Sequence, residues 1–215
     1  MTAPKPFIRE NTALIAPPLV PEVRLHLATE VVPLWRKTEE ELEAEGVPPP
    51  YWAFAWAGGQ ALARYVLDHP ETVRGQSVLD FGSGSGLVAI AAAKAGASQV
   101  LAADIDAFAA AAIALNADAN GVPLDITHQD VIGRGGGWQT ILVGDMCYER
   151  PLAERLLLWL GECVRASAGV TVLLGDPGRT YFPKSGVEKL ATYNVQTTRD
   201  LEDREIRETS VYRLA

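Results

Sequence analysis

Residues 80–86, Asp-Phe-Gly-Ser-Gly-Ser-Gly, constrain the fold of this chain more than any other stretch. An apolar run precedes them at 77–79, and an alanine-rich, helix-prone run follows at 87–94. A strand, a glycine turn and a helix in this order predict a ligand cradle, because backbone N–H groups converge where side chains are absent. We therefore expect Gly82 and Gly84 to bind a ligand, although an ordinary tight turn between a strand and a helix has the same composition.

The spacing of the glycines disfavours three other kinds of glycine-rich site. The dinucleotide fingerprint G-x-G-x-x-G requires a glycine where this chain has Leu87, since its third glycine is Gly86. A phosphate-binding P-loop ends in Gly-Lys-Ser/Thr, a tripeptide that the sequence lacks. A hydrolase nucleophile elbow needs serine in the middle of G-x-S-x-G, and the middle position here is Gly84.

The charge of the turn indicates which ligand it binds. Asp80 stands at the entrance of the turn, where a carboxylate repels a nucleotide phosphate and attracts a cation. S-adenosylmethionine carries an ammonium group and a sulfonium and has no phosphate. We predict that S-adenosylmethionine is the cofactor and that Asp80 is among the residues that bind it.

Acidic residues at the ends of the next two predicted strands extend the predicted site. Asp104 follows the run 99–103 and lies 22 residues after Gly82, about where an acidic residue binds ribose hydroxyls in nucleotide sites. Its neighbour Ile105 is expected to cover one face of the adenine, and Asp106 to cap the following helix. Asp130 follows the run 124–129, where it either accepts a hydrogen bond from the adenine amino group or is a plain loop acid.

Strand-like and helix-like segments alternate through the middle of the chain. Strands are predicted at 77–81, 99–103, 124–129, 139–144 and 169–174, and helices at 60–68, 86–95, 107–119 and 151–166. Strict alternation indicates a parallel sheet with helices on both faces. The segments 192–198 and 205–214 have only 199–204 between them and therefore predict an antiparallel hairpin. The predicted fold is α/β: a Rossmann-like, seven-stranded, mostly parallel sheet with a C-terminal antiparallel hairpin.

The first fifty residues are predicted to form an N-terminal helical extension, and residues 51–215 the cofactor-binding domain. The proline-rich residues 1–20 are expected to be irregular. A helix is predicted to begin at Pro21 and to include residues 22–27, and a second helix is predicted over 39–45.

Composition excludes several function classes. With 19 basic and 27 acidic residues, the formal net charge is −8, which argues against a nucleic-acid partner and leaves room for a basic protein substrate. The two cysteines lack C-x-x-C spacing and the three histidines are scattered, so no metal site is predicted. The chain has neither an apolar run of roughly 18 residues nor a signal-peptide pattern at its N-terminus, so we expect a cytoplasmic protein without a membrane partner.

Four further segments carry a resemblance to a known family. They are residues 50–65 with Trp-Ala-Gly-Gly-Gln, residues 104–106, residues 144–148 (Gly-Asp-Met-Cys-Tyr) and residues 175–179 (Gly-Asp-Pro-Gly-Arg). Together with the glycine turn, they resemble the lysine methyltransferases that modify the beta subunit of electron-transfer flavoprotein, over about residues 20 to 180. One departure is Cys147, which stands where the family motif has an aromatic residue. From the pattern of the N-terminus we expect a bacterial member, without an organelle-targeting segment, rather than a mitochondrial one.

The resemblance implies S-adenosylmethionine-dependent methylation of a lysine amine on the electron-transfer flavoprotein beta subunit. Asp145 lies just past an apolar strand, and we assign it to orient the amine; Tyr148 is assigned to the wall of the substrate slot. Trp56, Gly58 and Gly59 are expected to line the cofactor pocket.

A purely structural role is the alternative for several of these residues. Asp145 can cap the next helix while Tyr148 simply packs, and Trp52 and Trp56, four residues apart, can form one buried helical face. Arg179 either holds an acidic group of the substrate or closes a turn. At the level of function, the alternatives are methylation of another protein or of a small-molecule amine, and a catalytically silent cofactor-binding regulator.

Overall fold

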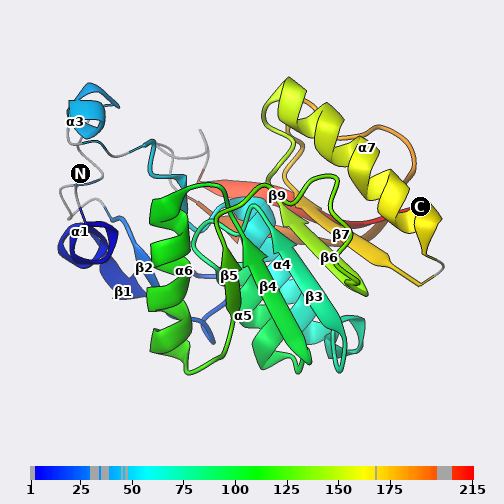
Figure 1. The fold of residues 1–215 in the computed structure, drawn as a ribbon, viewed down its shortest axis with the longest axis horizontal. Coiled ribbons are helices and arrows are strands. Elements are labelled where there is room, and N and C mark those ends of the chain that lie inside the picture. The colour runs from blue at the N-terminus through cyan, green and yellow to red at the C-terminus, as the bar shows by residue number, and fades with distance from the viewer. Residues whose placement is uncertain are drawn as a thin grey trace.

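The computed structural model describes residues 3–29, 34, 39–44, 46, 48–167, 169–197 and 205–215. Among these residues, seven strands form one sheet in the order β5-β4-β3-β6-β7-β9-β8 (Figure 1). The strands are β3 (Ser77–Phe81), β4 (Gln99–Ala103), β5 (Asp125–Thr127), β6 (Thr140–Gly144), β7 (Thr171–Asp176), β8 (Val187–Gln196) and β9 (Ile206–Leu214). The predicted Rossmann-like α/β fold is confirmed.

The sheet is parallel from β5 to β7, and β9 then pairs antiparallel with both β7 and β8. The predicted C-terminal hairpin is therefore confirmed, with β8 beginning five residues before the predicted segment. The predicted connection at 199–204 lies outside the described residues. Because parallel strands all point the same way, the ends of β3, β4, β6 and β7 meet at one edge of the sheet.

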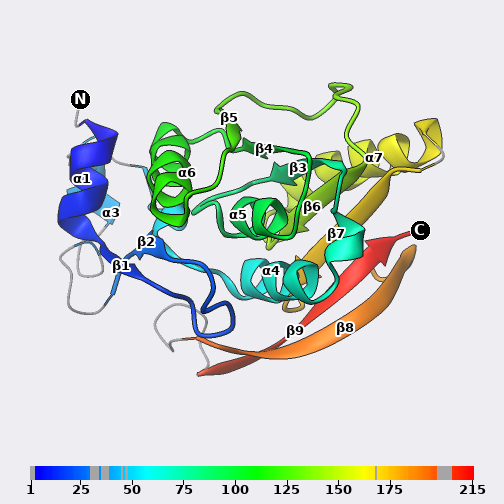
Figure 2. The same ribbon diagram turned by 90° about the horizontal axis from the view of Figure 1, so that it is seen from below.

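Helices cover both faces of the sheet, as predicted (Figure 2). On one face, Val78 and Leu142 pack into a buried cluster with α4 (Ala57–Asp68) and α5 (Leu87–Lys94). On the other face, Leu79 and Ile141 pack with Leu156 of α7 (Arg150–Ala166). Successive residues of these strands therefore pack on opposite faces of the sheet, which is the two-residue period of a strand that is buried on both faces.

The N-terminal segment is folded differently from the prediction. It contains α1 (Pro4–Asn11), β1 (Ala13–Ile15), β2 (Leu25–Leu27), α3 (Glu39–Ala44) and η1 (Tyr51–Ala53), and a further short helix, η2 (Pro70–Thr72), follows α4. The expectation of an irregular segment at 1–20 is wrong, because α1 and β1 lie there. The helix predicted over 39–45 corresponds to α3, and position 45 lies outside the described residues.

The helix predicted from Pro21 is also wrong, because residues 25–27 form a strand paired with β1. Leu25 and Leu27 are buried while His26 is half-buried, and the His26 N–H donates to Asn116 Oδ1 (2.7 Å). Asn116 belongs to α6 (Ala107–Asn120), so a contact between distant parts of the chain holds this strand. The extension thus combines helices with a two-stranded sheet, and the division of the chain at residue 50 remains a prediction.

The N-terminal segment packs on the outer side of α6, beside the β5 edge of the sheet. Phe7 of α1 meets Phe108 of α6 edge-on, with ring centroids 5.6 Å apart, and Trp52 of η1 stacks on the same ring at 6.3 Å. Within the described part of the chain, no helix has the length and apolar character needed to cross a membrane.

Candidate functional site

A cavity of about 490 Å³ opens at the edge where β3, β4 and β6 end. Its volume lies within the roughly 300–1,000 Å³ typical of small-molecule sites, and its position is the usual one for ligands of parallel sheets. The wall includes most of the residues that the sequence predicted for the site: Trp56, Gly82, Gly84, Asp104, Ile105, Asp130, Asp145 and Tyr148. Three predicted residues, Gly58, Gly59 and Asp80, are not on the wall.

The glycine turn reaches the cavity through backbone conformations that favour glycine. Gly82 and Gly84 have φ values of 65° and 54°, in the left-handed region. A side chain at Gly82 would also collide with Met146, whose Cε would lie 2.8 Å from the added Cβ. Met146 follows β6, so the absence of a side chain at Gly82 leaves room for the Met146 thioether beside the cavity.

Asp80 does not stand at the entrance of the turn, contrary to the prediction. Its side chain is 1% exposed and accepts hydrogen bonds from the Ser83 hydroxyl (2.6 Å) and from the Ala89 N–H (3.0 Å). Burial raises its pKa to about 7. Asp80 therefore fastens the turn to the first turn of α5, and it does not lie on the cavity wall.

Asp104 joins the glycine turn to the end of β4. Its Oδ2 accepts the Gly84 N–H (2.9 Å) and its Oδ1 accepts the Asp106 N–H (3.0 Å). A carboxylate has about four lone-pair sites, so Asp104 keeps acceptor capacity that a ligand hydroxyl can use. Asp106 caps α6 by accepting the Phe108 N–H (2.8 Å), as predicted. Ile105 presents its side chain at the wall and is 75% exposed.

Asp130 lies on the wall in an ion pair. Arg155 of α7 donates to its carboxylate, and its Oδ1 also accepts the Ile132 N–H (2.9 Å). The hydrogen bond from Arg155 lowers the pKa of Asp130 below its ordinary value. The sequence does not predict the position of Arg155, because no local pattern shows that a side chain of α7 reaches the loop after β5.

Asp145 has a backbone conformation that is rare for its residue type. Its φ is 59°, and among the described residues no other non-glycine residue has a positive φ. Its Oδ2 accepts the Gly59 N–H (3.0 Å), while Oδ1 accepts two bonds from Arg179, from Nε (3.0 Å) and Nη2 (2.7 Å). The Arg179 guanidinium lies 5.7 Å from the centroid of the Trp56 ring. Asp145, Arg179 and Trp56 thus form one connected group.

Gly58 and Gly59 lie against Asp145 of this group and are not on the cavity wall. A Cβ on Gly58 would lie 2.5 Å from Asp145 Oδ2 and closer still to the Gly175 carbonyl oxygen. The missing side chain lets the start of α4 sit against the ends of β6 and β7, where the Gly59 N–H reaches Asp145. Asp145 therefore binds the N-terminus of α4, whereas the alternative considered from the sequence was a cap on the following helix, α7.

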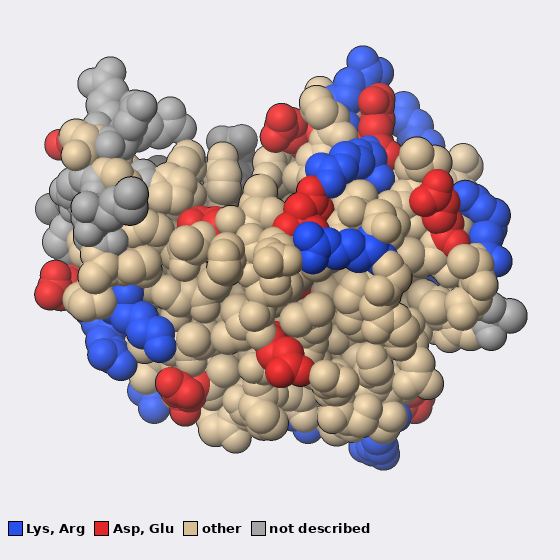
Figure 3. All heavy atoms as spheres, viewed as in Figure 1, with Lys and Arg blue, Asp and Glu red and all other residues tan. Residues whose placement is uncertain are grey.

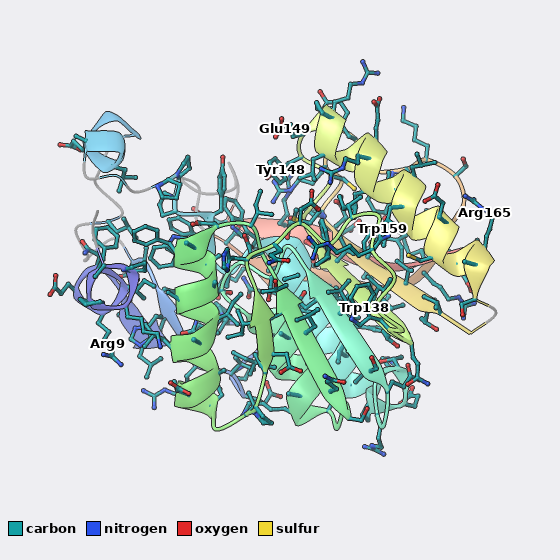
Figure 4. All side chains as sticks on the ribbon, in the orientation of Figure 1. Arg9, Trp138, Tyr148, Glu149, Trp159 and Arg165 are labelled. Atoms are coloured by element: carbon teal, nitrogen blue, oxygen red, sulfur yellow. The ribbon has the colours of Figure 1, made fainter. Side chains whose placement is uncertain are left out.

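Three aromatic side chains lie close together on the cavity wall, and we call them the aromatic mouth: Tyr51, Trp56 and Tyr148. The Tyr51 ring lies 6.1 Å from each of the other two rings, centroid to centroid. Tyr51 is 55% exposed and Tyr148 is 46% exposed, and Figure 4 shows Tyr148 beside the start of α7. Partial burial and the neighbouring Tyr51 raise the pKa of Tyr148.

Two details of the sequence prediction are settled near the mouth. Trp52 and Trp56 do not share a buried helical face, because Trp52 lies buried in η1 and Trp56 is the half-buried residue that precedes α4. Cys147 is buried and lies off the cavity wall, and burial together with Asp176 and Asp145 raises the pKa of its thiol to about 12. The replacement of an aromatic residue by Cys147 therefore alters the packing beneath the site rather than the wall.

The charge of the wall is predominantly negative. Two guanidinium groups, those of Arg155 and Arg179, pair with Asp130 and Asp145, and the carboxylates of Asp104 and Asp106 also lie on the wall. Figure 3 shows basic and acidic side chains side by side around α7, and Arg155 of that helix reaches the wall. Such a wall favours a cationic ligand without phosphate. Within the described ranges, no group of three or more His, Cys, Asp or Glu side chains could hold a metal ion.

Comparisons with known proteins agree on methyl transfer. A family model described as ribosomal protein L11 methyltransferase (PrmA) matches residues 60–137. The Xenopus laevis protein named electron transfer flavoprotein beta subunit lysine methyltransferase is 43% identical over 217 residues, which cover 98% of this chain and 87% of that protein. The Homo sapiens protein of the same name is 42% identical over 187 residues, covering 86% of this chain and 70% of that protein.

A solved structure shares the fold. Magnesium protoporphyrin IX methyltransferase from Synechocystis PCC 6803, described with bound SAM, superposes with a TM-score of 0.53. Its sequence identity is 16%, and the match covers 73% of this chain and 78% of that chain. At this identity, the likeness supports the arrangement of the sheet and helices and carries no information on the substrate.

Proposed function

Because the chain belongs to the electron transfer flavoprotein beta subunit lysine methyltransferase family, we propose that it methylates a lysine of that subunit, with S-adenosylmethionine as the methyl donor. The observation that carries the proposal is the composition of the cavity. Its wall combines a glycine turn and carboxylates suited to a cationic nucleoside with the three rings of the aromatic mouth. A lysine side chain can enter through the mouth while the cofactor occupies the inner end.

The residues on the wall fit S-adenosylmethionine. Gly82 and Gly84 would lie along the cofactor, Asp104 would accept ribose hydroxyls, and Ile105 would cover the adenine. The excess of carboxylates suits the cationic groups of this cofactor, and the volume of about 490 Å³ accommodates a nucleoside-sized ligand. When bound, S-adenosylmethionine supplies a methyl group on a cationic sulfur, so the new nitrogen–carbon bond forms as the carbon–sulfur bond breaks and its electron pair stays on sulfur.

The aromatic mouth would prepare the lysine amine for this reaction. Only the neutral amine has a free lone pair, and deprotonating a lysine with a pKa near 10.4 at pH 7 costs about 4–5 kcal/mol. The rings of Tyr51, Trp56 and Tyr148 would replace water around the amine and lower its pKa, because a less polar environment disfavours the charged form. They would also direct the side chain, and positioning is the main contribution expected from the protein.

Asp145 is proposed to orient the amine at the inner end of the mouth. Both of its oxygens accept hydrogen bonds from the protein, which fixes the carboxylate in one position on the cavity wall. Tyr148 is proposed to form the opposite wall of the slot. A proton released from the amine would pass to water, since the mouth is open to solvent.

The proposal is tested by incubating the protein with purified electron-transfer flavoprotein and labelled S-adenosylmethionine, followed by mass spectrometry of the beta subunit. We expect methyl groups on lysine in the beta subunit with the wild type and a loss of at least tenfold in rate with Asp145→Ala. Asp125→Ala is the matched control, because Asp125 begins β5 and lies off the cavity wall.

Three results would contradict the proposal. An unmodified beta subunit would remove the assigned substrate. In a parallel assay on cell lysate, label found in the small-molecule fraction alone would indicate a small-molecule amine instead. Cofactor binding without transfer to any tested substrate would indicate a silent regulator.

A further inference from the structure

We propose that Arg179 is a positioning residue that pairs with Asp145, so that the site accepts the substrate lysine as the neutral amine rather than as the ammonium ion. The inference rests on the proposed function, because lysine methylation requires an unprotonated nitrogen. Arg179 acts here through Asp145 and Trp56, both of which lie on the cavity wall.

The geometry of Arg179 is fixed from both ends of the residue. Its backbone N–H donates to Asp176 Oδ1 (2.7 Å), which also accepts the Gly178 N–H (2.7 Å), so the turn after β7 has a defined shape. Its Nε and Nη2 both donate to Asp145 Oδ1, and its guanidinium lies near the Trp56 ring. The arginine side chain is only 18% exposed. A planar guanidinium is suited to two such bonds and to an aromatic neighbour at once, which an ammonium group is not.

The pairing changes what Asp145 does to an incoming lysine. A carboxylate without a nearby cation would attract the ammonium form and raise the pKa of the bound amine, which would retain the proton that must leave. Arg179 balances this charge, and its own positive charge disfavours a second cation beside it. The carboxylate can then accept an N–H of the neutral amine without stabilising the protonated one.

Other ionisable groups also face this part of the site, and they come from several elements. Cys147 and Tyr148 follow Asp145 along the chain, Tyr51 comes from η1, Asp104 from the end of β4, Asp176 from β7, Arg207 from β9 and Glu149 from the start of α7. Burial raises the pKa of the Cys147 thiol to about 12, so that group stays uncharged near neutral pH. All of these groups are the same in variants at position 179, so a difference between such variants reports the Arg179 charge.

The test is the pH dependence of kcat for methylation of the beta subunit, because kcat reports pKa values in the enzyme–substrate complex. With Arg179→Met, the rising limb of the profile is expected to move to higher pH by about one unit or more. With Arg179→Lys, which keeps the charge, most of that shift should disappear. With Asp145→Asn, the limb should move to lower pH. Arg213→Met is the matched control, since Arg213 pairs with Glu188 on the terminal hairpin, off the cavity wall, and its profile should coincide with that of the wild type.

Proton release on binding gives a readout that needs no turnover. Calorimetry of beta-subunit binding without cofactor, in buffers of different ionisation enthalpy at pH 8, should show more protons released by the wild type than by Arg179→Met. A variant that is slower but has the wild-type pH profile and proton release would overturn the proposal and leave Arg179 with a structural role. If Arg179→Met fails to fold, an Asp145→Asn profile that does not move to lower pH would overturn it equally.

Failure of the proposed function is distinguishable from failure of this inference. A wild type that leaves the beta subunit unmethylated contradicts the substrate assignment alone. Proton release on binding of n-butylamine, which mimics a lysine side chain, then tests Arg179 independently: equal release by the wild type and Arg179→Met contradicts the inference, and greater release by the wild type supports it.

Discussion

Replacement of glycine by alanine at the start of α4 is predicted to lower the thermal stability of the protein at Gly58 and to raise it at the adjacent Gly59. A Cβ at Gly58 would lie 2.5 Å from Asp145 Oδ2, whereas the nearest atom to a Cβ at Gly59 is a Val88 methyl carbon at 4.0 Å. Ordinary van der Waals contact begins at 3.4 Å, so Gly58→Ala requires a shift of about 0.9 Å relative to Asp145 Oδ2 and a larger one relative to the Gly175 carbonyl oxygen, while Gly59→Ala requires none.

The atoms that would have to move are held in place. The Gly175 carbonyl oxygen, which also lies in the path of the added Cβ, accepts the Asp145 N–H (3.0 Å). Overpacking of this kind typically costs about 1–3 kcal/mol, and the crowding of backbone and a fixed carboxylate favours the upper half of that range. The gain in helix propensity from glycine to alanine, up to about 1 kcal/mol, offsets part of the cost at Gly58 and is the whole effect at Gly59.

Thermal unfolding followed by circular dichroism measures both variants. At about 2–4 °C per kcal/mol for a chain of this size, we expect Gly58→Ala to lower Tm by roughly 3–8 °C and Gly59→Ala to raise it by roughly 1–4 °C. At 25 °C, Gly58→Ala should lose methyl transfer, because Asp145 is displaced, and Gly59→Ala should retain cofactor affinity. Equal Tm values, or a more stable Gly58→Ala, would refute the close-approach reasoning. A large loss of cofactor affinity in Gly59→Ala would show that Gly59 touches the cofactor after all.

Three further predictions concern stability and the cofactor. The folded-state pKa of Asp80 is raised to about 7, so its contribution to stability is present at low pH and is lost as the pH rises toward 7. In urea unfolding between pH 4 and 8, the free energy of unfolding should therefore fall less with rising pH for Asp80→Asn than for the wild type. In calorimetry, Asp104→Asn should weaken S-adenosylmethionine binding by at least tenfold and Asp130→Asn by less than threefold. The reason is that Asp104 also holds the glycine turn, whereas the Asp130 carboxylate is paired with Arg155. A larger effect of Asp130→Asn than of Asp104→Asn would contradict these assignments. Phe7→Ala should cost about 3 kcal/mol and lower Tm by roughly 6–12 °C, and an unchanged Tm would show that α1 contributes little to the fold.

The alternating part of the fold was predictable because its signals are local. Most strands from β3 to β7 are apolar runs next to a turn or a helix cap, and most of the predicted bounds agree with the structure to within two residues. Asp106 could be assigned as the cap of α6 from its position alone, and the structure confirms it. Strand β5 was predicted longer than observed, because propensity does not show where pairing with β4 ends.

The N-terminal segment was mispredicted because a tertiary contact decides its structure. Proline at position 21 favoured a helix start, but Leu25 and Leu27 alternate with the less buried His26, which is a strand pattern. That pattern is present in the sequence and was outweighed by Pro21. The bond from the His26 backbone to Asn116, ninety residues away, could not be foreseen from either segment.

The sequence predicts which residues lie at the site better than it predicts what each of them does there. The strand-end rule brought Asp104, Ile105 and Asp145 to the cavity, since all of them follow parallel strands. The rule does not tell whether a carboxylate at such a position faces the ligand, and Asp80 faces inward because Ser83 and Ala89 bind it. The partnership of Asp145 with Arg179 was equally hidden, because a sequence does not show which side chain a loop thirty-four residues away will present.

The measurement that tests this account most directly is calorimetric titration of the protein with S-adenosylmethionine, NADH and ATP under identical conditions. The acidic cavity wall and the glycine turn predict binding of one S-adenosylmethionine per chain and negligible binding of the two phosphorylated nucleotides. Tight binding of NADH or ATP with no heat from S-adenosylmethionine would contradict the assignment of the cavity and, with it, the proposed methyl transfer.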